Sequence, residues 1–481
     1  MRTLEDCRMN NNMNIAPLKV EQEFLVTIKR IGINGEGIGY YKRQAVFIPG
    51  TLVGEEVVAT CTRVAHGYAE AEVVRIKKKS NQRKKPVCEV YGKCGGCQLQ
   101  HMAYSEQLRV KRDMIIQALE RYTNLDIDDF EVRQTMGMEN PLNYRNKAQM
   151  PVGYDDEGIM VGFYSMNSRE LVHVSDCDVQ YEDINHAMNH AVDLLDEYKV
   201  FAYAPKTKKG TARHIVIRQA HKTKELQVTF VMANNEFKKI DELAKELMTY
   251  CPNVKSVFVN INKEDTHEIF GPDMIHVAGQ KVITDKLGKF KFNLSPRAFY
   301  QLNPEQTVKL YNQVKFAADL KGTEKVVDAY CGVGTIGQWV ADKAAEVRGV
   351  DITRSAIIDA KENADLNGLK NTYYAVGKAE QVIPKWANEG FKPDVVIVDP
   401  PRTGLQPELI EMLKRVQPQT IVYVSCNPST LAKNLKELTK RYRIDYIQPL
   451  DLFPQTSHVE AVVRLVKLNK EQRKGHKGNK R

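Results

Sequence analysis

Apolar positions in the last third of the chain follow an alternating pattern that predicts an α/β fold. Short apolar runs bounded by turn residues indicate buried strands, and they lie at residues 325–328, 346–351, 372–376, 394–399, 420–425 and 443–449. Segments whose apolar residues recur at helical spacing lie among them, at residues 305–318, 336–344 and 355–367. This alternation predicts a mostly parallel, doubly wound sheet over residues 293–467.

A different pattern near the start of the chain predicts a small closed barrel over residues 18–76. Five short alternating runs with turn signals between them lie at residues 23–28, 35–40, 45–48, 55–60 and 69–74. Barrels of this size often bind single-stranded nucleic acid through a basic face with exposed aromatic side chains. Tyr40, Tyr41, Lys42, Arg43 and Tyr68 are candidates for such a face. The alternative is that these aromatic residues fill the core of the barrel.

Between the barrel and the sheet, residues 77–292 combine a basic linker, a cysteine loop and an α+β region. Residues 105–122 have helical spacing, and strand-like and helix-like segments alternate further on. We expect residues 1–17 to be disordered and residues 468–481 to form a basic tail. Neither region shows an apolar period.

Composition and charge favour a cytoplasmic protein that binds a polyanion. The chain has 481 residues, no apolar stretch near the roughly 20 residues of a membrane span, and a polar start without a signal-peptide core. The net charge is +10, and residues 75–85 and 470–481 are dense in lysine and arginine. This placement suits RNA, although solvated linkers also carry such runs. We expect a monomer without an obligate protein partner and without membrane contact.

Four of the nine cysteines stand out by their spacing. Cys88, Cys94 and Cys97 form a C-x5-C-x2-C loop rich in glycine, and Cys177 lies further along the chain. A chain without a secretory signal favours metal, cluster or catalytic use of cysteine over disulfides. Glycines let a tight loop wrap thiolates around one inorganic centre. An iron–sulfur cluster, a structural zinc ion and unrelated free thiols all remain possible from the spacing.

Two motifs indicate where a nucleotide-like cofactor binds. Gly332 and Gly334 begin a GxGxxG turn between a strand and a helix, and Asp351 ends the next strand, where a carboxylate holds ribose hydroxyls. Nicotinamide and S-adenosylmethionine sites share this arrangement. Asp399 is followed by two prolines that stiffen the chain, so its carboxylate is presented rigidly into the crevice. Asp399 and a strand-end cysteine favour the methyl donor over a dinucleotide.

Cys426 and Glu460 are candidates for covalent chemistry. Cys426 directly follows the apolar run 420–425, at the edge where open α/β sheets bind ligands. Uracil C5 is a poor nucleophile until a thiolate adds at C6, and Cys426 is placed to be that thiolate. Glu460 lies between apolar residues that raise a carboxyl pKa, which suits a base for the C5 proton. The alternatives are a buried small side chain for Cys426 and a surface charge for Glu460.

These motifs together resemble the RNA uracil-C5 methyltransferase family, most closely its bacterial 23S ribosomal RNA branch. The resemblance extends from about residue 19 to 467 and rests on motifs in the family's order. They are Phe299-Tyr300-Gln301-Leu302-Asn303, Asp328-Ala329-Tyr330-Cys331-Gly332-Val333-Gly334, Asp399-Pro400-Pro401-Arg402, Ser425-Cys426-Asn427-Pro428 and Phe453-Pro454 leading to Glu460. The resemblance implies a TRAM-type, OB-like barrel, an α+β central domain and a Rossmann-like class I methyltransferase domain.

The resemblance also implies a role for each site residue. It makes Cys426 the nucleophile and Glu460 the base, and it places Gln301, Tyr330, Asp351 and Asp399 around S-adenosylmethionine and uracil. It implies that the four cysteines hold a [4Fe-4S] cluster and that the substrate is 23S ribosomal RNA. Two positions depart from the family pattern: Tyr300 stands where Phe is usual, and Asp351 where Glu is common.

Three rival interpretations are distinguished by particular residues. RNA cytosine-C5 methyltransferases typically carry a second cysteine after the Pro-Pro motif, where this chain has Arg402. The uracil-specific tRNA enzyme lacks the barrel and the cluster cysteines. A non-catalytic iron–sulfur RNA-binding protein would not need Cys426 together with Glu460.

Overall fold

The computed structural model describes residues 18–166, 168, 170–264 and 268–469. Its contacts divide the chain into two units. The barrel unit comprises residues up to Lys85 together with Gln98–Ala103, and the large unit comprises Pro86–Cys97 and the chain from Tyr104 onward. The disorder expected for residues 1–17 and most of the basic tail expected at 468–481 lie outside the described residues.

The barrel unit contains a closed five-stranded barrel, which confirms the prediction for this region. Its strands are β1 (Glu23–Ile31), β2 (Gly37–Tyr41), β3 (Gln44–Ile48), β4 (Glu56–Ala65) and β5 (Tyr68–Lys78), in the order β1-β2-β3-β5-β4. Tyr41 packs against Phe24 with ring centroids 5.1 Å apart, whereas Tyr40 is exposed. Lys42 and Arg43 form the β2–β3 turn with positive φ angles. Of the candidate aromatic residues, Tyr40 is therefore available to a ligand and Tyr41 supports the core.

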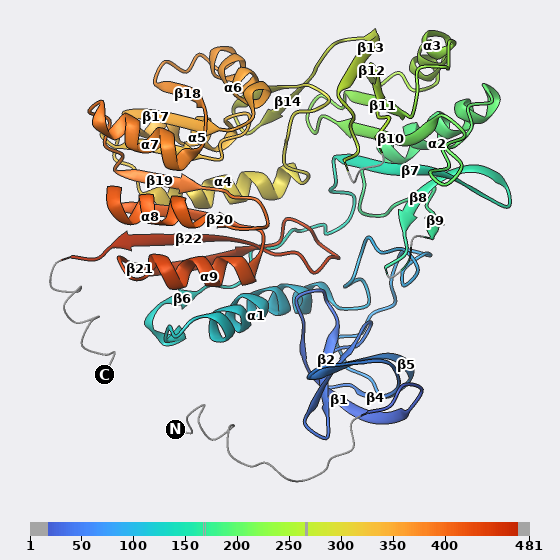
Figure 1. Ribbon diagram of the computed structural model, residues 1–481, viewed down its shortest axis with the longest axis horizontal. Helices are drawn as coiled ribbons and strands as arrows, with labels where there is room; N and C mark the ends of the chain where they lie inside the picture. Colours follow the sequence, from blue (N-terminus) through green and yellow to red (C-terminus); the bar gives the residue numbers. More distant parts are fainter. Residues whose placement is uncertain (1–17, 167, 169, 265–267, 470–481) are drawn as a thin grey trace. The chain divides into compact units, whose positions relative to one another are not determined.

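The first part of the large unit is built around a seven-stranded sheet in the order β13-β12-β11-β10-β7-β8-β9. Its strands are β7 (Lys147–Asp155), β8 (Gly158–Tyr164), β9 (Leu171–His173), β10 (Ala212–Gln219), β11 (Leu226–Met232), β12 (Val254–Ile261) and β13 (Asp273–Gly279). Helices α2 (Glu182–Glu197) and α3 (Ile240–Tyr250) pack on this sheet (Figure 1) and bury apolar residues in one core. The hairpin β14 (Ile283–Leu287) and β15 (Phe290–Leu294) follows.

The second part of the large unit is the predicted doubly wound sheet, with the order β18-β17-β16-β19-β20-β22-β21-β6. The parallel strands are β16 (Lys325–Ala329), β17 (Glu346–Asp351), β18 (Thr372–Val376), β19 (Val395–Val398) and β20 (Thr420–Ser425). The connecting helices are α4 (Pro304–Ala318), α5 (Thr335–Val340), α6 (Arg354–Leu366), α7 (Ala379–Asn388), α8 (Pro407–Val416) and α9 (Pro428–Leu438). The expected Rossmann-like fold is confirmed.

The antiparallel end of this sheet recruits a segment from far earlier in the chain. Strand β22 (Glu460–Lys467) inserts between β20 and β21 (Tyr442–Leu450), and the short strand β6 (Glu131–Val132) pairs with β21. The preceding helix α1 (Tyr104–Tyr122) packs against α9 (Figure 1). Residues 104–132, which the sequence pattern groups with the central region, thus complete the methyltransferase-like sheet.

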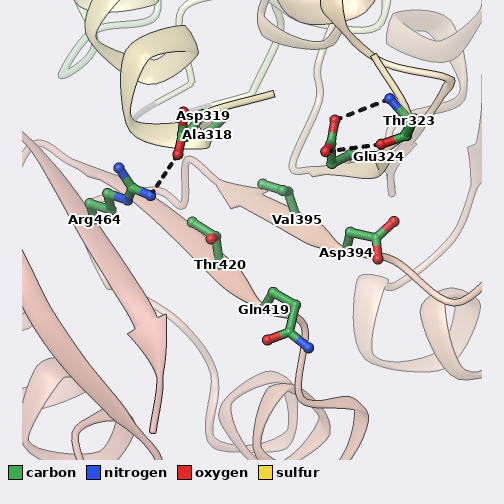
Figure 2. A pocket seen from close by; sticks show the side chains of 9 residues that line it. All are labelled: Ala318, Asp319, Thr323, Glu324, Asp394, Val395, Gln419, Thr420 and Arg464. Carbon is green, nitrogen blue, oxygen red and sulfur yellow. Dashed lines mark hydrogen bonds and ion pairs between the residues drawn. The ribbon is translucent and has the colours of Figure 1, made fainter. Parts of the chain in front are cut away.

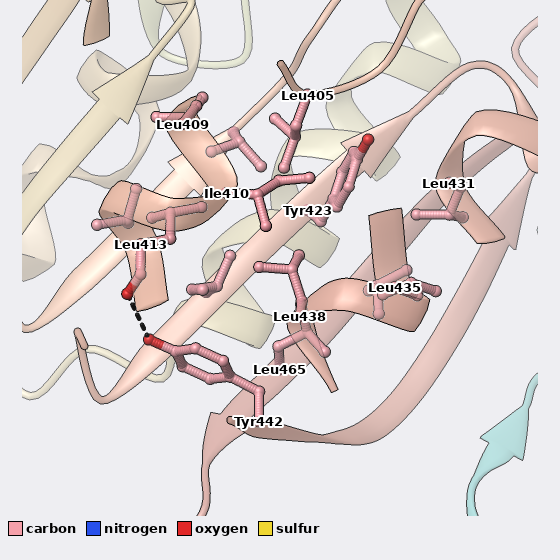
Figure 3. Packing of buried hydrophobic residues seen from close by; sticks show 14 of the residues in the cluster. Leu405, Leu409, Ile410, Leu413, Tyr423, Leu431, Leu435, Leu438, Tyr442 and Leu465 are labelled. Carbon is pink, nitrogen blue, oxygen red and sulfur yellow. Dashed lines mark hydrogen bonds between the residues drawn. The ribbon is translucent and has the colours of Figure 1, made fainter. Parts of the chain in front are cut away.

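An apolar core of leucine and tyrosine side chains fixes α8 and α9 on this sheet. Figure 3 shows Leu405, Leu409 and Leu413 gathered with Leu431, Leu435 and Leu438 in one cluster beside the strands. Tyr442 is fully buried, and its hydroxyl donates to the carbonyl of Leu413 at 3.4 Å. Burial of such side chains contributes about 1.5–3 kcal/mol each, so the strand ends that carry the candidate site residues are held firmly. Within the described residues, no helix combines the length and apolarity needed to cross a bilayer.

Candidate active site

The strand register brings the predicted site residues to one edge of the large sheet. Ala329 of β16 pairs with Val350 on one side and Val398 on the other, and Val398 pairs with Tyr423 of β20. The residues that follow these pairs are therefore neighbours at the carboxyl edge. They are Tyr330, Asp351, Asp399 and, beyond the end of β20, Cys426.

The glycine-rich turn after β16 is held in an unusual backbone conformation. Tyr330, Gly332 and Gly334 have φ angles of 65°, 53° and 81°, in the left-handed region that favours glycine. The Asp351 carboxylate accepts from the backbone N–H of Gly332 at 3.1 Å and from that of Thr353 at 2.8 Å. Asp351 thus links the turn to the end of β17.

The turn has room and polar groups for a nucleoside-like ligand. A Cβ placed on Gly332 would meet nothing within 4 Å, so the backbone is open to close approach. Asp328 accepts from the N–H of Gly337 at 2.8 Å through Oδ2, while its buried Oδ1 has no hydrogen-bond partner. Burial raises the pKa of Asp328 to about 7 and that of Tyr330 to about 12. Open backbone and an unpartnered carboxyl oxygen fit a cofactor that carries hydrogen-bonding groups.

Asp399 lies at this edge, and the predicted site residue Gln301 lies before α4. Asp399 is half-buried before Pro400, and burial raises the pKa of its carboxyl to about 7. Gln301 lies before α4, where its carbonyl accepts from Nδ2 of Asn146 at 3.1 Å. Its neighbour Tyr300 is buried against Phe292. The substitution of Tyr for the family's usual Phe therefore adds a hydroxyl to the core, and Gln301 beside it is half-buried.

Cys426 and Glu460 meet because β22 runs antiparallel to β20. Ser425 pairs with Ala461, so the residue after β20 lies beside the first residue of β22. Burial, reinforced by the Glu460 and Asp399 carboxyls, raises the pKa of the Cys426 thiol to about 12. Burial, together with Asp399, holds the pKa of Glu460 well above its usual range. Neither residue is an exposed charge, and the two are electrostatically coupled.

Arg402 is a site residue whose role sequence reasoning did not find. Its guanidinium lowers the pKa of both Cys426 and Glu460, opposing the effect of burial. Its Nη2 lies 3.1 Å from Nε2 of His458. Burial and Arg402 lower the pKa of His458 to about 4, so the imidazole is neutral at neutral pH. Because guanidinium only donates, Nε2 of His458 accepts this hydrogen bond.

A buried ion pair fastens the segment that carries Glu460. Lys111 of α1 and Asp451 are both fully buried, with Nζ and Oδ1 2.5 Å apart. Lys111 also donates to the carbonyl of Phe453 at 3.0 Å, and the Tyr104 hydroxyl donates to Asp451 at 3.0 Å. The sequence carries a signal for this pair, since Lys111 lies on the largely apolar buried face of α1.

The four predicted ligand cysteines all belong to the large unit. Three of them, Cys88, Cys94 and Cys177, lie close enough to influence one another's pKa. Cys94 and Cys88 both act on the pKa of Cys177, which burial raises to about 11. Backbone N–H groups point at the sulfurs, and that of Gly96 donates to Sγ of Cys94 at 3.3 Å. Such N–H groups stabilise thiolates bound to iron. The donor set and its hydrogen bonds fit an iron–sulfur cluster.

A cavity of about 340 Å3 opens at the opposite edge of the sheet. Figure 2 shows Glu324, Val395 and Thr420 around it, at the amino ends of β16, β19 and β20. Arg464 closes one side through its ion pair with Asp319 at 3.2 Å. This cavity lies away from Cys426 and Glu460 and is not part of the candidate active site.

Comparison with known proteins identifies the family. The model of the tRNA (uracil-5-)-methyltransferase family matches residues 103–468, and the TRAM domain matches residues 17–74. The chain belongs to this methyltransferase family. A Bacillus cereus relative is 51% identical over 94% of this chain and 98% of its own length, and a Halalkalibacterium halodurans relative is 48% identical over 95% and 99%. Both are named uncharacterized RNA methyltransferases.

One solved structure is similar to this protein over nearly the whole chain. The Pyrococcus abyssi tRNA (uracil-54, C5)-methyltransferase in complex with S-adenosyl-L-homocysteine has a TM-score of 0.74 and 28% identity, and covers 92% of this chain and 100% of its own. The uncovered 8% is too short to leave out the whole barrel unit. Presence of the barrel therefore does not separate a ribosomal RNA enzyme from a tRNA enzyme, contrary to our expectation.

Proposed function

We propose that this RNA methyltransferase transfers the methyl group of S-adenosylmethionine to C5 of a uridine in 23S ribosomal RNA. The observation that carries the proposal is the pairing of Ser425 with Ala461, because it sets a cysteine beside a buried glutamate at the ligand edge of the sheet. In this chemistry the cysteine can act as the nucleophile and the glutamate as the base.

In the proposed reaction, Cys426 acts first. Its thiol loses a proton to solvent, and the sulfur then forms a bond to C6 of uracil, which makes C5 an enolate carbon. The positive charge of Arg402 favours the thiolate and opposes the burial that raises the pKa of Cys426. The rigid Asp399-Pro400 segment borders the same edge of the sheet and orients the uracil ring.

S-adenosylmethionine, when bound, would supply an electrophilic methyl group, so that C5 gains a bond to the methyl carbon while the sulfonium S–CH3 bond breaks. The open turn at Gly332 and the carboxylate of Asp351 would hold the donor, with Tyr330, Gly334 and Gln301 beside them. Glu460, as carboxylate, then removes the C5 proton, the S–C6 bond breaks, and the Cys426 thiolate leaves. The net products are 5-methyluridine, the demethylated donor and one proton, so atoms and charge balance.

Cys88, Cys94, Cys97 and Cys177 would hold a [4Fe-4S] cluster in this enzyme. The resemblance to the ribosomal RNA branch of the family favours a cluster over zinc, and the nearby thiols and the N–H group that points at the Cys94 sulfur fit such a centre. The cluster would join the loop of residues 88–97 to the segment around Cys177. We assign it a structural role, since no step above requires an electron.

Transfer RNA is the second candidate substrate, because the similar Pyrococcus abyssi enzyme is named for a tRNA uridine. A direct test incubates the full-length enzyme and labelled S-adenosylmethionine with unmodified 23S ribosomal RNA or unmodified tRNA. Nucleoside analysis then measures labelled 5-methyluridine. Label in ribosomal RNA alone supports the proposal. Label in tRNA alone shows that tRNA is the substrate instead. Label in a nucleoside other than 5-methyluridine overturns the proposed chemistry.

A further inference from the structure

A second cluster of metal-ligating side chains lies on the face of the central domain, outside the candidate active site. His186 and His190 project from α2, and Cys251 follows the last residue of α3. One ligand atom from each of the three lies within 4.8 Å of the other two. We propose that His186, His190 and Cys251 bind a Zn2+ ion that clamps α2 to α3.

The helical register explains why the two histidines share one site. Residues four apart on a helix lie on the same face, one turn apart, and the rings of His186 and His190 have centroids 4.5 Å apart. Ala187 and Ala191 of the same helix are buried in the core beneath them. The core thus fixes α2 and keeps both imidazoles on its outer side.

Cys251 is held in place by the backbone around it. Its N–H donates to the carbonyl of Leu247 at 2.8 Å, and its carbonyl accepts from the N–H of Val254 at 2.9 Å. These two bonds tie the end of α3 to the start of β12. The side chain is buried, so the thiol cannot turn away to solvent.

The distance between the Cys251 sulfur and the His186 nitrogen suits tetrahedral zinc. Sγ of Cys251 lies 3.7 Å from Nδ1 of His186. With Zn–N and Zn–S bonds of about 2.1 and 2.3 Å, a tetrahedral ion separates nitrogen and sulfur by about 3.6 Å. The His190 ring stacks on Tyr250 with an interplanar angle of 6°, which restrains its orientation as outer contacts of metal ligands commonly do.

The donor types select the metal class. Two imidazoles and one thiolate are borderline to soft ligands, which favour Zn2+ over Mg2+ or Ca2+. Binding converts the Cys251 thiol to a thiolate and releases one proton. Three protein ligands leave one tetrahedral position for water, and half-exposed His190 and exposed His186 give solvent access to the ion.

The ion would stabilise the central domain, because it would bond two residues of α2 to the residue that follows α3. Metal binding to the folded state adds to folding free energy. The proposal is independent of the methyl transfer reaction, since the site does not include any residue of the candidate active site.

The test measures zinc binding to full-length protein and to three variants, His186→Gln, His190→Gln and Cys251→Ser. His66→Gln is the matched control, because His66 is an exposed histidine of the barrel unit. Each chain is titrated with Zn2+ against a chromophoric chelator, and its melting temperature is measured with and without Zn2+. All variants keep the four cysteines of the other candidate metal site, so metal bound there is common to every chain. The test therefore compares the zinc stoichiometry of each variant with that of the wild type.

The wild type and the control should bind one more zinc equivalent per chain than the Cys251→Ser variant. The His186→Gln and His190→Gln variants should bind that equivalent at least tenfold more weakly, and zinc should raise the melting temperature of the wild type and control only. Co2+ should give a thiolate charge-transfer band that Cys251→Ser lacks. Equal zinc stoichiometry and equal melting shifts in all five chains would overturn the proposal. His186→Gln serves if Cys251→Ser folds poorly, because His186 is exposed.

Discussion

Nη2 of Arg402 donates to Nε2 of His458 at 3.1 Å, next to both Cys426 and Glu460. The neutral imidazole holds the guanidinium without cancelling its charge, because the pKa of His458 is lowered to about 4. The full positive charge of Arg402 is thus available to the two acidic groups. Arg402 therefore counteracts the effect of burial on the pKa values of Cys426 and Glu460.

Removing that charge should move the pH profile of the reaction. The pKa of Cys426 is raised to about 12, so the thiolate fraction, and with it the rate of C6 addition, grows with pH up to that value. We expect Arg402→Met to raise the pKa further and lower the single-turnover rate about tenfold at fixed pH, since a nearby opposite charge shifts a pKa by about one unit or more. Arg402→Lys should recover part of the rate. An Arg402→Met profile identical to wild type would contradict this role.

Glu460→Gln should block the reaction after methyl transfer. The amide cannot accept the C5 proton, so the S–C6 bond cannot break and a protein–RNA adduct should accumulate as a denaturation-resistant band. Glu460→Asp keeps a carboxylate and should turn over slowly without a persistent adduct. In wild type the elevated pKa of Glu460 makes this step faster as pH rises. Unchanged turnover by Glu460→Gln would assign the base elsewhere.

The pair of Lys111 and Asp451 should be important for stability. Removing one partner of a buried ion pair leaves an uncompensated charge and costs about 3–5 kcal/mol. We expect Lys111→Met to lower the free energy of unfolding by this amount, measured by denaturant unfolding. Asp451→Leu in addition should recover part of the loss, because both charges are then gone. A single variant as stable as wild type would show that the pair is energetically neutral.

If the proposed cluster forms, the iron content of the protein depends on cysteines from two segments that are far apart in the sequence. Cys94→Ser and Cys177→Ser should each abolish the iron of anaerobically purified protein, because each removes one of four ligands. Cys61→Ser, in the barrel unit, should retain about four irons per chain. Wild-type protein that is colourless and carries zinc at the four cysteines would instead favour a tetrahedral zinc site.

Local patterns predicted most of this fold because buried strands and amphipathic helices carry their own periods. The runs that became β16, β19 and β20 were each visible as short apolar segments, and the motifs at their ends predicted Asp399 and Cys426 as neighbours. The pairing of β6 with β21 joins residues more than three hundred positions apart, and no local period encodes it. The contact of Arg402 with His458 joins residues in two separate loops, and no local period encodes it either. Lys111 could have been found, since a lysine on an apolar helical face needs a buried partner.

The most direct test of the account traps the nucleophile on RNA that contains 5-fluorouridine. Fluorine at C5 cannot be removed as a proton, so addition and methyl transfer should leave the enzyme bound to RNA, and peptide mass mapping locates the bond. We predict one adduct, on Cys426, that is absent from Cys426→Ala. The second cysteine near this edge, Cys331, is buried with its pKa well above the usual range and should carry none. An adduct at Cys331, or methylation of ordinary RNA by Cys426→Ala at the wild-type rate, would contradict the covalent mechanism.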